Sequence, residues 1–225
     1  MTFHRPQNKE PLFLIAGLTL AMVLIHNTGT DFWLAGHFFS GGQWIFRDNF
    51  FLEKILHKGG VIFTQVCLAT LIFFRIKDRQ DLFKKHYLNV VLISTILSII
   101  SVFLLKRVTT FPCPWSSQAF SGEHPLLPYR MLFATDYPKG RCFPAGHSSG
   151  GYAFLSLYFA YTFIYGKRNF RALIPGLFLG LVFGITQQLR GAHFLSHDLA
   201  TIIVCIFVSW FTIWGYYSYS NKHET

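Results

Sequence analysis

Six long runs of apolar residues, separated by short polar segments, dominate the chain. A helix that crosses a bilayer needs about 20 predominantly apolar residues. The runs that meet this requirement cover residues 11–30, 59–76, 87–105, 148–166, 172–190 and 196–217. The pattern predicts an all-α, polytopic membrane protein built as a bundle of six transmembrane helices. We interpret the first run as a span and not as a cleaved signal peptide, because it is long and no small-residue cleavage site follows it.

The polar segments between these runs are too short to fold separately. We therefore expect residues 1–225 to form a single membrane domain. Residues 31–58 mix Trp and Phe with charged residues, which is typical of a helix that lies in the plane of the lipid headgroups. In the fifth run, Gly176 and Gly180 have the spacing of closely packed helices, which is weak evidence for such packing on its own.

The composition supports a membrane protein. Charged residues make up 13% of the chain, whereas soluble domains carry about 25%. The net charge is +10, but the basic residues lie in short loops and not on one face that fits a nucleic acid. We therefore expect the bilayer and a membrane lipid as partners, and no nucleic acid.

The distribution of basic residues predicts the orientation. The segments on the side of the two termini contain 11 Lys and Arg residues and four acidic residues, against nine and six on the other side. Cytoplasmic loops carry the excess of Lys and Arg, so we expect both termini in the cytoplasm. Residues 31–58, 106–147 and 190–198 then face outward.

Three outward-facing stretches carry polar residues next to span ends. They read KRVTTFPCPW at 106–115, RCFPAGHSSGG at 141–151 and QQLRGAHFLSHD at 187–198. Ionisable residues at membrane depth are costly and are usually functional. Lys, Arg, His and Asp gathered on one side indicate an anionic substrate and proton transfer.

The residue types in these stretches fit phosphate chemistry. His193 can attack phosphorus, and Asp198 is the nearby carboxylate that would orient its ring. Arg190, one helical turn before His193, has the planar fork that holds phosphate oxygens. His147 stands where a helix begins, and the free N–H group of Gly146 would attract phosphate there. The plainer interpretation is that these residues only cap helices and close a tight loop.

In this order and on this side of the membrane, the stretches resemble the phosphatidic-acid-phosphatase type 2 superfamily. Its pattern is K-x6-R-P, then P-S-G-H, then S-R-x5-H-x3-D. The resemblance implies that His193 is the phosphate nucleophile and His147 the acid for the leaving group. It also implies that Lys106 binds phosphate and that neither a metal nor another cofactor is needed.

The chain departs from this pattern at four positions. Cys113 and Gln187 stand where the pattern has Arg, Ala145 replaces Ser, and His197 occupies the place of the Asp, one residue before Asp198. Basic residues that would compensate for the first lost Arg are Arg107, Arg130 and Arg141, of which we favour Arg141.

The resemblance is closest to the small bacterial branch that acts on lipid A phosphates. A similar G-G-H-F-F-S-D stretch occurs there, as does an early segment like residues 35–38. It implies a lipid phosphatase in the bacterial inner membrane, with cytoplasmic termini and a periplasmic active site. Lipid A, undecaprenyl pyrophosphate, phosphatidic acid and phosphatidylglycerol phosphate are all possible substrates.

The cysteines and histidines leave alternatives open. Cys113 and Cys142 would form a disulfide in an oxidising periplasm, or stay as free thiols. His193 and His197, at i and i+4, have the spacing of two zinc ligands, with His147, Cys142 or Asp198 as a third. That arrangement would make the protein a metal-dependent membrane hydrolase. His37 and His57 fit best as interfacial residues.

Two further alternatives concern the reaction. A phosphotransferase with the same fold would pass the phosphate to another lipid, because the shape of the pocket selects the acceptor. The absence of two pattern Arg residues also fits a non-catalytic lipid-binding protein, although binding alone does not require a paired acid and nucleophile.

Overall fold

The computed structural model describes residues 9–77, 80–125 and 127–223 of the chain. The long helices are α1 (Glu10–Asn27), α3 (Gly59–Lys77), α4 (Leu82–Val108), α7 (Ile174–Leu189) and α8 (Leu195–His223). The shorter elements are α2 (Thr30–Gly36), β1 (Phe39–Ser40), β2 (Gln43–Trp44), η1 (Phe51–Lys58), η2 (Pro114–Ser116), η3 (Gln118–Phe120), η4 (Tyr129–Met131), α5 (Gly146–Tyr152), η5 (Ala153–Leu155), α6 (Ser156–Tyr165) and η6 (Phe170–Leu173). The terminal residues 1–8 and 224–225, predicted to be cytoplasmic, lie outside the described residues.

The all-α membrane fold is confirmed. Within the described residues, five helical segments are long and apolar enough to cross a membrane: 10–27, 51–77, 82–108, 170–189 and 195–220. The remaining predicted span, 148–166, corresponds to α5, η5 and α6 in direct succession. Each of these three pieces is too short to cross a bilayer alone, so the sixth span is a helix interrupted by one 3-10 turn.

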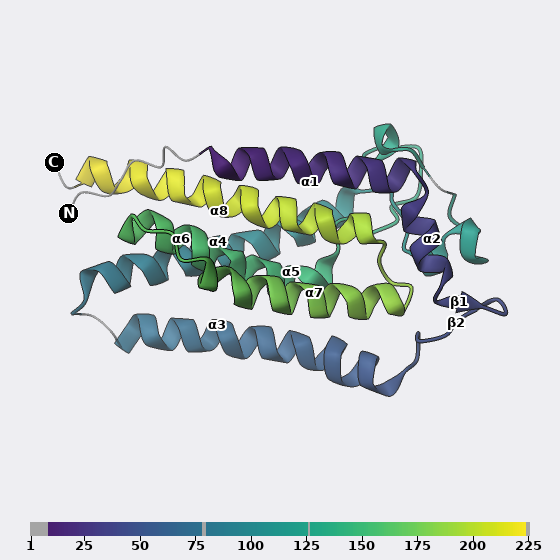
Figure 1. Ribbon diagram of the computed structural model, residues 1–225, viewed down its shortest axis with the longest axis horizontal. Coiled ribbons are helices and arrows are strands. Elements are labelled where there is room, and N and C mark those ends of the chain that lie inside the picture. Colours follow the sequence, from purple (N-terminus) through teal and green to yellow (C-terminus); the bar gives the residue numbers. More distant parts are fainter. Residues whose placement is uncertain (1–8, 78–79, 126, 224–225) are drawn as a thin grey trace.

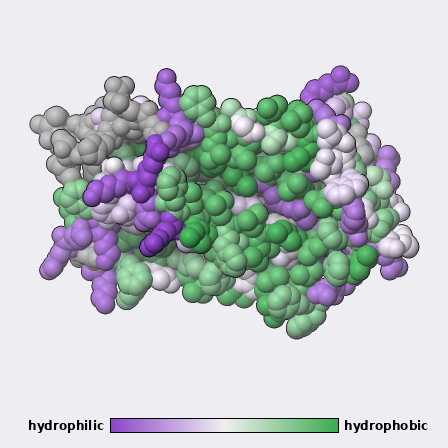
Figure 2. All heavy atoms as spheres, in the orientation of Figure 1, coloured by the Kyte–Doolittle hydropathy of each residue, from purple (hydrophilic) through white to green (hydrophobic). Residues whose placement is uncertain are grey.

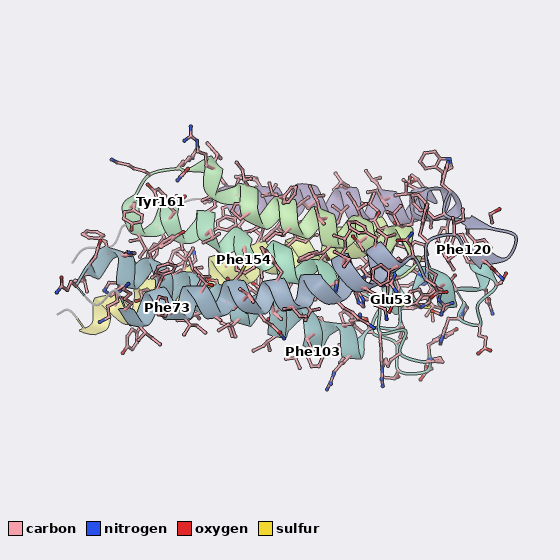
Figure 3. All side chains as sticks on the ribbon, turned by 90° about the horizontal axis from the view of Figure 1, so that it is seen from below. Glu53, Phe73, Phe103, Phe120, Phe154 and Tyr161 are labelled. Atoms are coloured by element: carbon pink, nitrogen blue, oxygen red, sulfur yellow. A yellow bond between two sulfur atoms is a disulfide. The ribbon has the colours of Figure 1, made fainter. Side chains whose placement is uncertain are left out.

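The helices run side by side as one elongated bundle (Figure 1). The short elements α2, β1 and β2 lie together at one end, which we call the loop end. Hydrophobic residues cover the middle of the visible face, and hydrophilic residues gather towards the two ends (Figure 2). In Figure 3, Phe120 and Glu53 lie towards the loop end, whereas Phe73 and Tyr161 lie towards the opposite end. This arrangement is typical of a protein whose waist is embedded in lipid.

The prediction of a single interfacial helix over 31–58 is wrong. The segment instead forms the short helix α2, the hairpin β1–β2 and the π-helix η1, which continues directly into α3. Gly41 and Gly42 at the hairpin turn have φ values of 58° and 78°. Glycine adopts this left-handed conformation without steric cost, so the Gly-Gly pair turns the chain back where the prediction continued a helix.

A row of glycines on α7 allows neighbouring segments to come close. A Cβ atom on Gly180 would lie 2.1 Å from the ring of Tyr152, and one on Gly176 would lie 2.6 Å from the backbone nitrogen of Leu155. Small residues at an interface let helix backbones approach each other. The close packing expected from the Gly176 and Gly180 spacing is thus present, and it holds α5 and η5 against α7.

The loop end has an aromatic core of its own. Ala35, Trp44, Phe120 and Phe194 pack together and are all buried. Burial of a large apolar side chain stabilises a fold by about 1.5–3 kcal/mol. Because these residues come from α2, β2, η3 and the α7–α8 connection, their packing fixes that connection against the N-terminal hairpin.

Candidate active site

A cavity of about 530 Å³ opens at the loop end of the bundle. It lies between η1, the last turns of α4, the start of α5 and the α7–α8 connection. The residues that line it are His57, Ile99, Phe103, Lys106, Arg107, Cys113, Trp115, Arg141, Cys142, Gly146, His147, Ser149, Gln187, Ala192 and His193. These lining residues include three basic residues and three histidines but neither Asp nor Glu, so the cavity favours an anion.

Lys106 and the first residue of α5 meet inside this cavity. Lys106 belongs to the last turn of α4, and a Cβ atom on Gly146 would lie 3.4 Å from its Nζ. The first backbone N–H groups of a helix lack partners within the helix. A cation therefore lies beside unpaired N–H groups, and this combination attracts a phosphate oxygen.

His193 lies in the connection between α7 and α8. Its side chain is 5% exposed, and its backbone N–H group donates to the carbonyl oxygen of Gln187 at 3.4 Å. Burial, reinforced by the positive charge of Lys106, keeps the pKa of His193 well below the ordinary value of 6.5. The imidazole is therefore neutral at neutral pH, as a nucleophile must be.

His147 is the second residue of α5. Its Nε2 atom donates to the backbone carbonyl oxygen of His57 at 2.8 Å, and the two imidazole rings lie 4.0 Å apart between centroids. Ala145, two residues before His147, is fixed to α8. Its N–H group donates to the carbonyl oxygen of His197, and its own carbonyl oxygen accepts from Thr201 Oγ1 at 2.9 Å. Ala145, which stands in place of a Ser, is fully buried in this contact.

Arg107 and Arg141 line the cavity beside Lys106. The guanidinium of Arg107 lies over the ring of Phe103, 4.2 Å from its centroid. Arg141 has a φ value of 55°, in the left-handed region that residues other than glycine seldom adopt. Such strained residues persist where surrounding structure holds them and cluster at functional sites.

A disulfide joins Cys113 to Cys142, with 5.1 Å between their Cα atoms. Both cysteines line the cavity, so the covalent bond ties the loop after α4 to the loop before α5. Cys67 and Cys205 are free.

The structure does not bring Asp198 to His193. The Oδ2 atom of Asp198 accepts a hydrogen bond from Gln188 Nε2 at 2.5 Å, and its carboxyl group packs against Gly184. Helix α8 begins at Leu195, so Asp198 is one turn inside the helix and faces α7. In the described part of the chain, the Nδ1 atom of His193 has no hydrogen-bond partner, so the predicted orienting carboxylate is not in contact with the ring.

Arg190 and His197 also lie outside the cavity. The Nε atom of Arg190 donates to the carbonyl oxygen of Arg47 at 3.0 Å, and its Nη1 atom donates to Gln187 Oε1 at 3.4 Å. His197 lines a separate small cavity together with His26. In the structure the two side chains of Arg190 and His197 are therefore engaged elsewhere and are not among the residues that line this cavity.

The predicted zinc set is not assembled. His197 faces the other small cavity, and the sulfur of Cys142 is held in the disulfide. Among the residues that the structure describes, no three His, Cys, Asp or Glu side chains come together as metal ligands.

Sequence reasoning assigned His57 to the membrane interface and did not single out Asp31, yet both residues shape the site. His57 lines the cavity and supplies the carbonyl oxygen that His147 contacts. Asp31 is almost completely buried, and its carboxylate accepts hydrogen bonds from the backbone N–H group and the hydroxyl of Ser196, at 3.0 and 2.5 Å. It therefore caps the start of α8. The linear pattern contains no signal for either contact, because the partners lie 90 and 165 residues apart.

One comparison with known proteins identifies a family. The family model described as the PAP2 superfamily matches residues 87–221, which include α4 from Tyr87 onward and every later element up to the last turn of α8. Neither a curated protein nor a solved structure matches the chain.

Proposed function

This chain belongs to the PAP2 superfamily, and from this membership we propose that it is an integral membrane lipid phosphatase that works through a phosphohistidine intermediate. Members of the superfamily are generally phosphatases that act on phosphate esters, and the apolar helices of this chain indicate membrane association. One observation carries the finer proposal. His147 and His193, from separate elements, line one cavity together with Lys106 and without a carboxylate.

The first step forms a covalent intermediate. A ring nitrogen of His193 attacks the phosphorus, the P–N bond forms, and the bond between phosphorus and the ester oxygen breaks. The imidazolium form of His147 gives its Nε2 proton to that oxygen, so the lipid leaves with a protonated oxygen and His147 becomes neutral. In the structure this proton is directed at the carbonyl oxygen of His57, and we propose that the leaving oxygen takes the place of this carbonyl when substrate binds.

The second step releases phosphate. A water molecule attacks the phosphorus, its proton passes to His147, and the P–N bond breaks to give inorganic phosphate. Lys106, Arg107, Arg141 and the N–H group of Gly146 stabilise the charge on the phosphate oxygens in both transition states. Asp198 and Arg190 have no direct part, because Asp198 accepts from Gln188 and Arg190 donates to the carbonyl oxygen of Arg47.

A lipid is the substrate class that fits the surroundings of the cavity. Ile99 and Phe103 line it on the same face of α4 as Lys106 and lie deeper in the span. We propose that the headgroup binds at Lys106 while the acyl or prenyl chains run along these residues into the bilayer. Lipid A, undecaprenyl pyrophosphate and glycerophospholipid phosphates all have this two-part character.

We also propose that the cavity opens to the periplasm of a bacterial inner membrane, with cytoplasmic termini. The excess of Lys and Arg on the side of the termini supports this orientation. The Cys113–Cys142 bond at the cavity supports it independently, because disulfides persist in oxidising compartments.

Phosphate release by the purified protein from a panel of these lipids tests the proposal. Each lipid is assayed with and without a strong chelator, and with His193→Ala as the inactive control. We expect release from at least one lipid, unaffected by the chelator. Activity that disappears on chelation and returns with zinc would instead support a metal-dependent hydrolase. Transfer of labelled phosphate to a second lipid would identify a phosphotransferase, and no reaction with any lipid would refute the proposal.

A further inference from the structure

His57 belongs to a part of the chain that the family match does not include, yet it lines the cavity of the proposed active site. It lies near the end of the π-helix η1, in which no residue is fully buried. The carbonyl oxygen of His57 accepts from His147 Nε2 at 2.8 Å, and the two imidazole rings lie 4.0 Å apart between centroids. The backbone and the side chain of His57 therefore both contact the proposed acid.

One ring nitrogen of His57 is accessible. Its Nδ1 atom is buried and has no hydrogen-bond partner among the described residues, whereas its Nε2 atom is not buried in this way. A buried N–H group without an acceptor is rare in proteins, which favours the tautomer with the proton on Nε2. The carbonyl oxygen is already engaged with His147. The Nε2–H group is therefore the polar group of His57 that a ligand in the cavity can contact.

The other polar side chains of η1 are engaged with each other. The Nζ atoms of Lys54 and Lys58 lie 3.3 and 3.2 Å from Glu53 Oε1. None of these three residues lines the cavity. His57 is therefore the polar side chain of η1 that a substrate headgroup can reach.

The position of His57 places it on the side of the leaving group. In an in-line displacement, the attacking and leaving atoms lie on opposite sides of the phosphorus, and His147 protonates the leaving oxygen in the proposed mechanism. Two positively charged rings 4.0 Å apart would repel each other, so His57 is neutral when His147 is the imidazolium acid. A neutral imidazole still donates from one ring nitrogen.

We propose that His57 is a further substrate-binding residue, whose Nε2–H group donates to an oxygen of the leaving group next to the ester oxygen that His147 protonates. The inference rests on the proposed function, because it places the leaving group beside His147. It adds a selection among lipids. A glycerol, a sugar or a second phosphate in the leaving group offers such an acceptor, whereas the leaving group of a prenyl monophosphate offers only hydrocarbon there.

Two substitutions separate the donor from the stacked ring. His57→Phe keeps an aromatic ring against His147 and removes the donor, whereas His57→Gln keeps an N–H donor and removes the ring. Both keep the backbone carbonyl group that His147 contacts. His37→Phe, at an exposed histidine of the loop end, is the matched control. The substrates are a prenyl monophosphate and a prenyl diphosphate of the same chain length, whose leaving groups differ only by the second phosphate.

The loss in His57→Phe should depend on the leaving group. We expect kcat/KM to fall about 10- to 100-fold with the diphosphate, the loss of one hydrogen bond to a charged group, and to stay unchanged with the monophosphate. His57→Gln should keep most of the activity with both lipids, and His37→Phe all of it. Equal losses with both lipids would show that His57 acts only through His147. Unchanged values with both would show that it does not contact substrate, and either result overturns the inference.

Binding without turnover separates this inference from the proposed function. In the His193→Gln variant, which lacks the nucleophile, Kd is measured for dihexanoyl phosphatidic acid and for inorganic phosphate by the rise in melting temperature. Adding His57→Phe should raise the Kd of the lipid about 3- to 10-fold, the value of one hydrogen bond between uncharged groups. The Kd of inorganic phosphate, which has no leaving group, should stay unchanged.

This result would stand even if no lipid were hydrolysed. Equal Kd values of the lipid with and without His57→Phe, or no binding of the lipid by the His193→Gln variant, would refute the inference. A parallel increase in the Kd of inorganic phosphate would also refute it, because His57 would then bind the transferred phosphate and not the leaving group.

Discussion

The N-terminal third of the chain and the part from α4 onward differ sharply in how they pack. Only 6% of the span window in α1 and 11% of that in η1–α3 is buried, against 44% in α4 and 39% in α8. His57 is the one described residue before α4 that lines the cavity. Yet the N-terminal third supplies three contacts to the later part of the chain. The carbonyl oxygen of Arg47 holds Arg190, and that of His57 holds His147. The carboxylate of Asp31 holds the start of α8. The later helices therefore contain the reacting groups, and the earlier segments fix their positions.

The largest effect should come from the reacting groups themselves. We expect His193→Ala and His147→Ala each to lower phosphate release by about 10⁴-fold or more, because one removes the nucleophile and the other the acid. His37→Ala, an exposed histidine at the loop end, serves as the control with unchanged release. Melting curves show whether each variant is folded. Substantial release by folded His193→Ala would assign the chemistry to another residue.

The disulfide should contribute most to stability among the loop contacts. Closing a loop of about 30 residues stabilises a fold by about 3.5 kcal/mol in the chain-entropy model. Cys113→Ser/Cys142→Ser should lower the free energy of unfolding by that order, as measured by denaturant titration in detergent. Thiol labelling of the denatured wild type provides the control, with two reactive cysteines before reduction and four after it. Four labelled thiols in the unreduced protein would contradict the bond.

Asp31 tests whether the N-terminal third positions the site. Asp31→Ala leaves the N–H group and the hydroxyl of Ser196 without their buried acceptor, which should cost about 2–3 kcal/mol of stability. Asp31→Asn keeps one acceptor oxygen and should cost less. The exposed Asp48→Ala is the control. Denaturant titration measures all three, and equal stability of Asp31→Ala and Asp48→Ala would show that Asp31 does not hold α8.

The buried His193 should make stability depend on pH. Its pKa lies well below 6.5 in the folded protein because of burial, whereas the unfolded chain takes up a proton near 6.5. The unfolded state therefore binds more protons as the pH falls below 6.5, and stability should fall by up to about 1.4 kcal/mol per pH unit from this group. His193→Gln should flatten the slope between pH 6.5 and 5. An identical slope in both proteins would place the charge change elsewhere.

The sequence predicts the spans well because a bilayer requires a continuous apolar run for each helix, and α4 and α8 follow directly from that requirement. The positions of Lys106, His147 and His193 at span ends were also accessible, and the structure brings them to one cavity. The positions of Asp198 and Arg190 could not be predicted from the sequence. The position of Asp198 depends on where α8 begins, and that of Arg190 depends on a carbonyl oxygen 143 residues away. The fold of residues 31–58 was missed because a Gly-Gly turn and a π-helix replace the expected periodicity.

Isolation of the covalent intermediate would decide whether His193 carries the phosphate. The protein is mixed with a lipid bearing a radiolabelled phosphate and quenched in alkali, where phosphohistidine survives, and the label is mapped by peptide sequencing. We predict label on His193 in the wild type and none in His193→Ala. In His147→Ala the label on His193 should increase if the substitution slows the second step more than the first. Label on a different residue, or rapid phosphate release without any labelled His193, would contradict the mechanism.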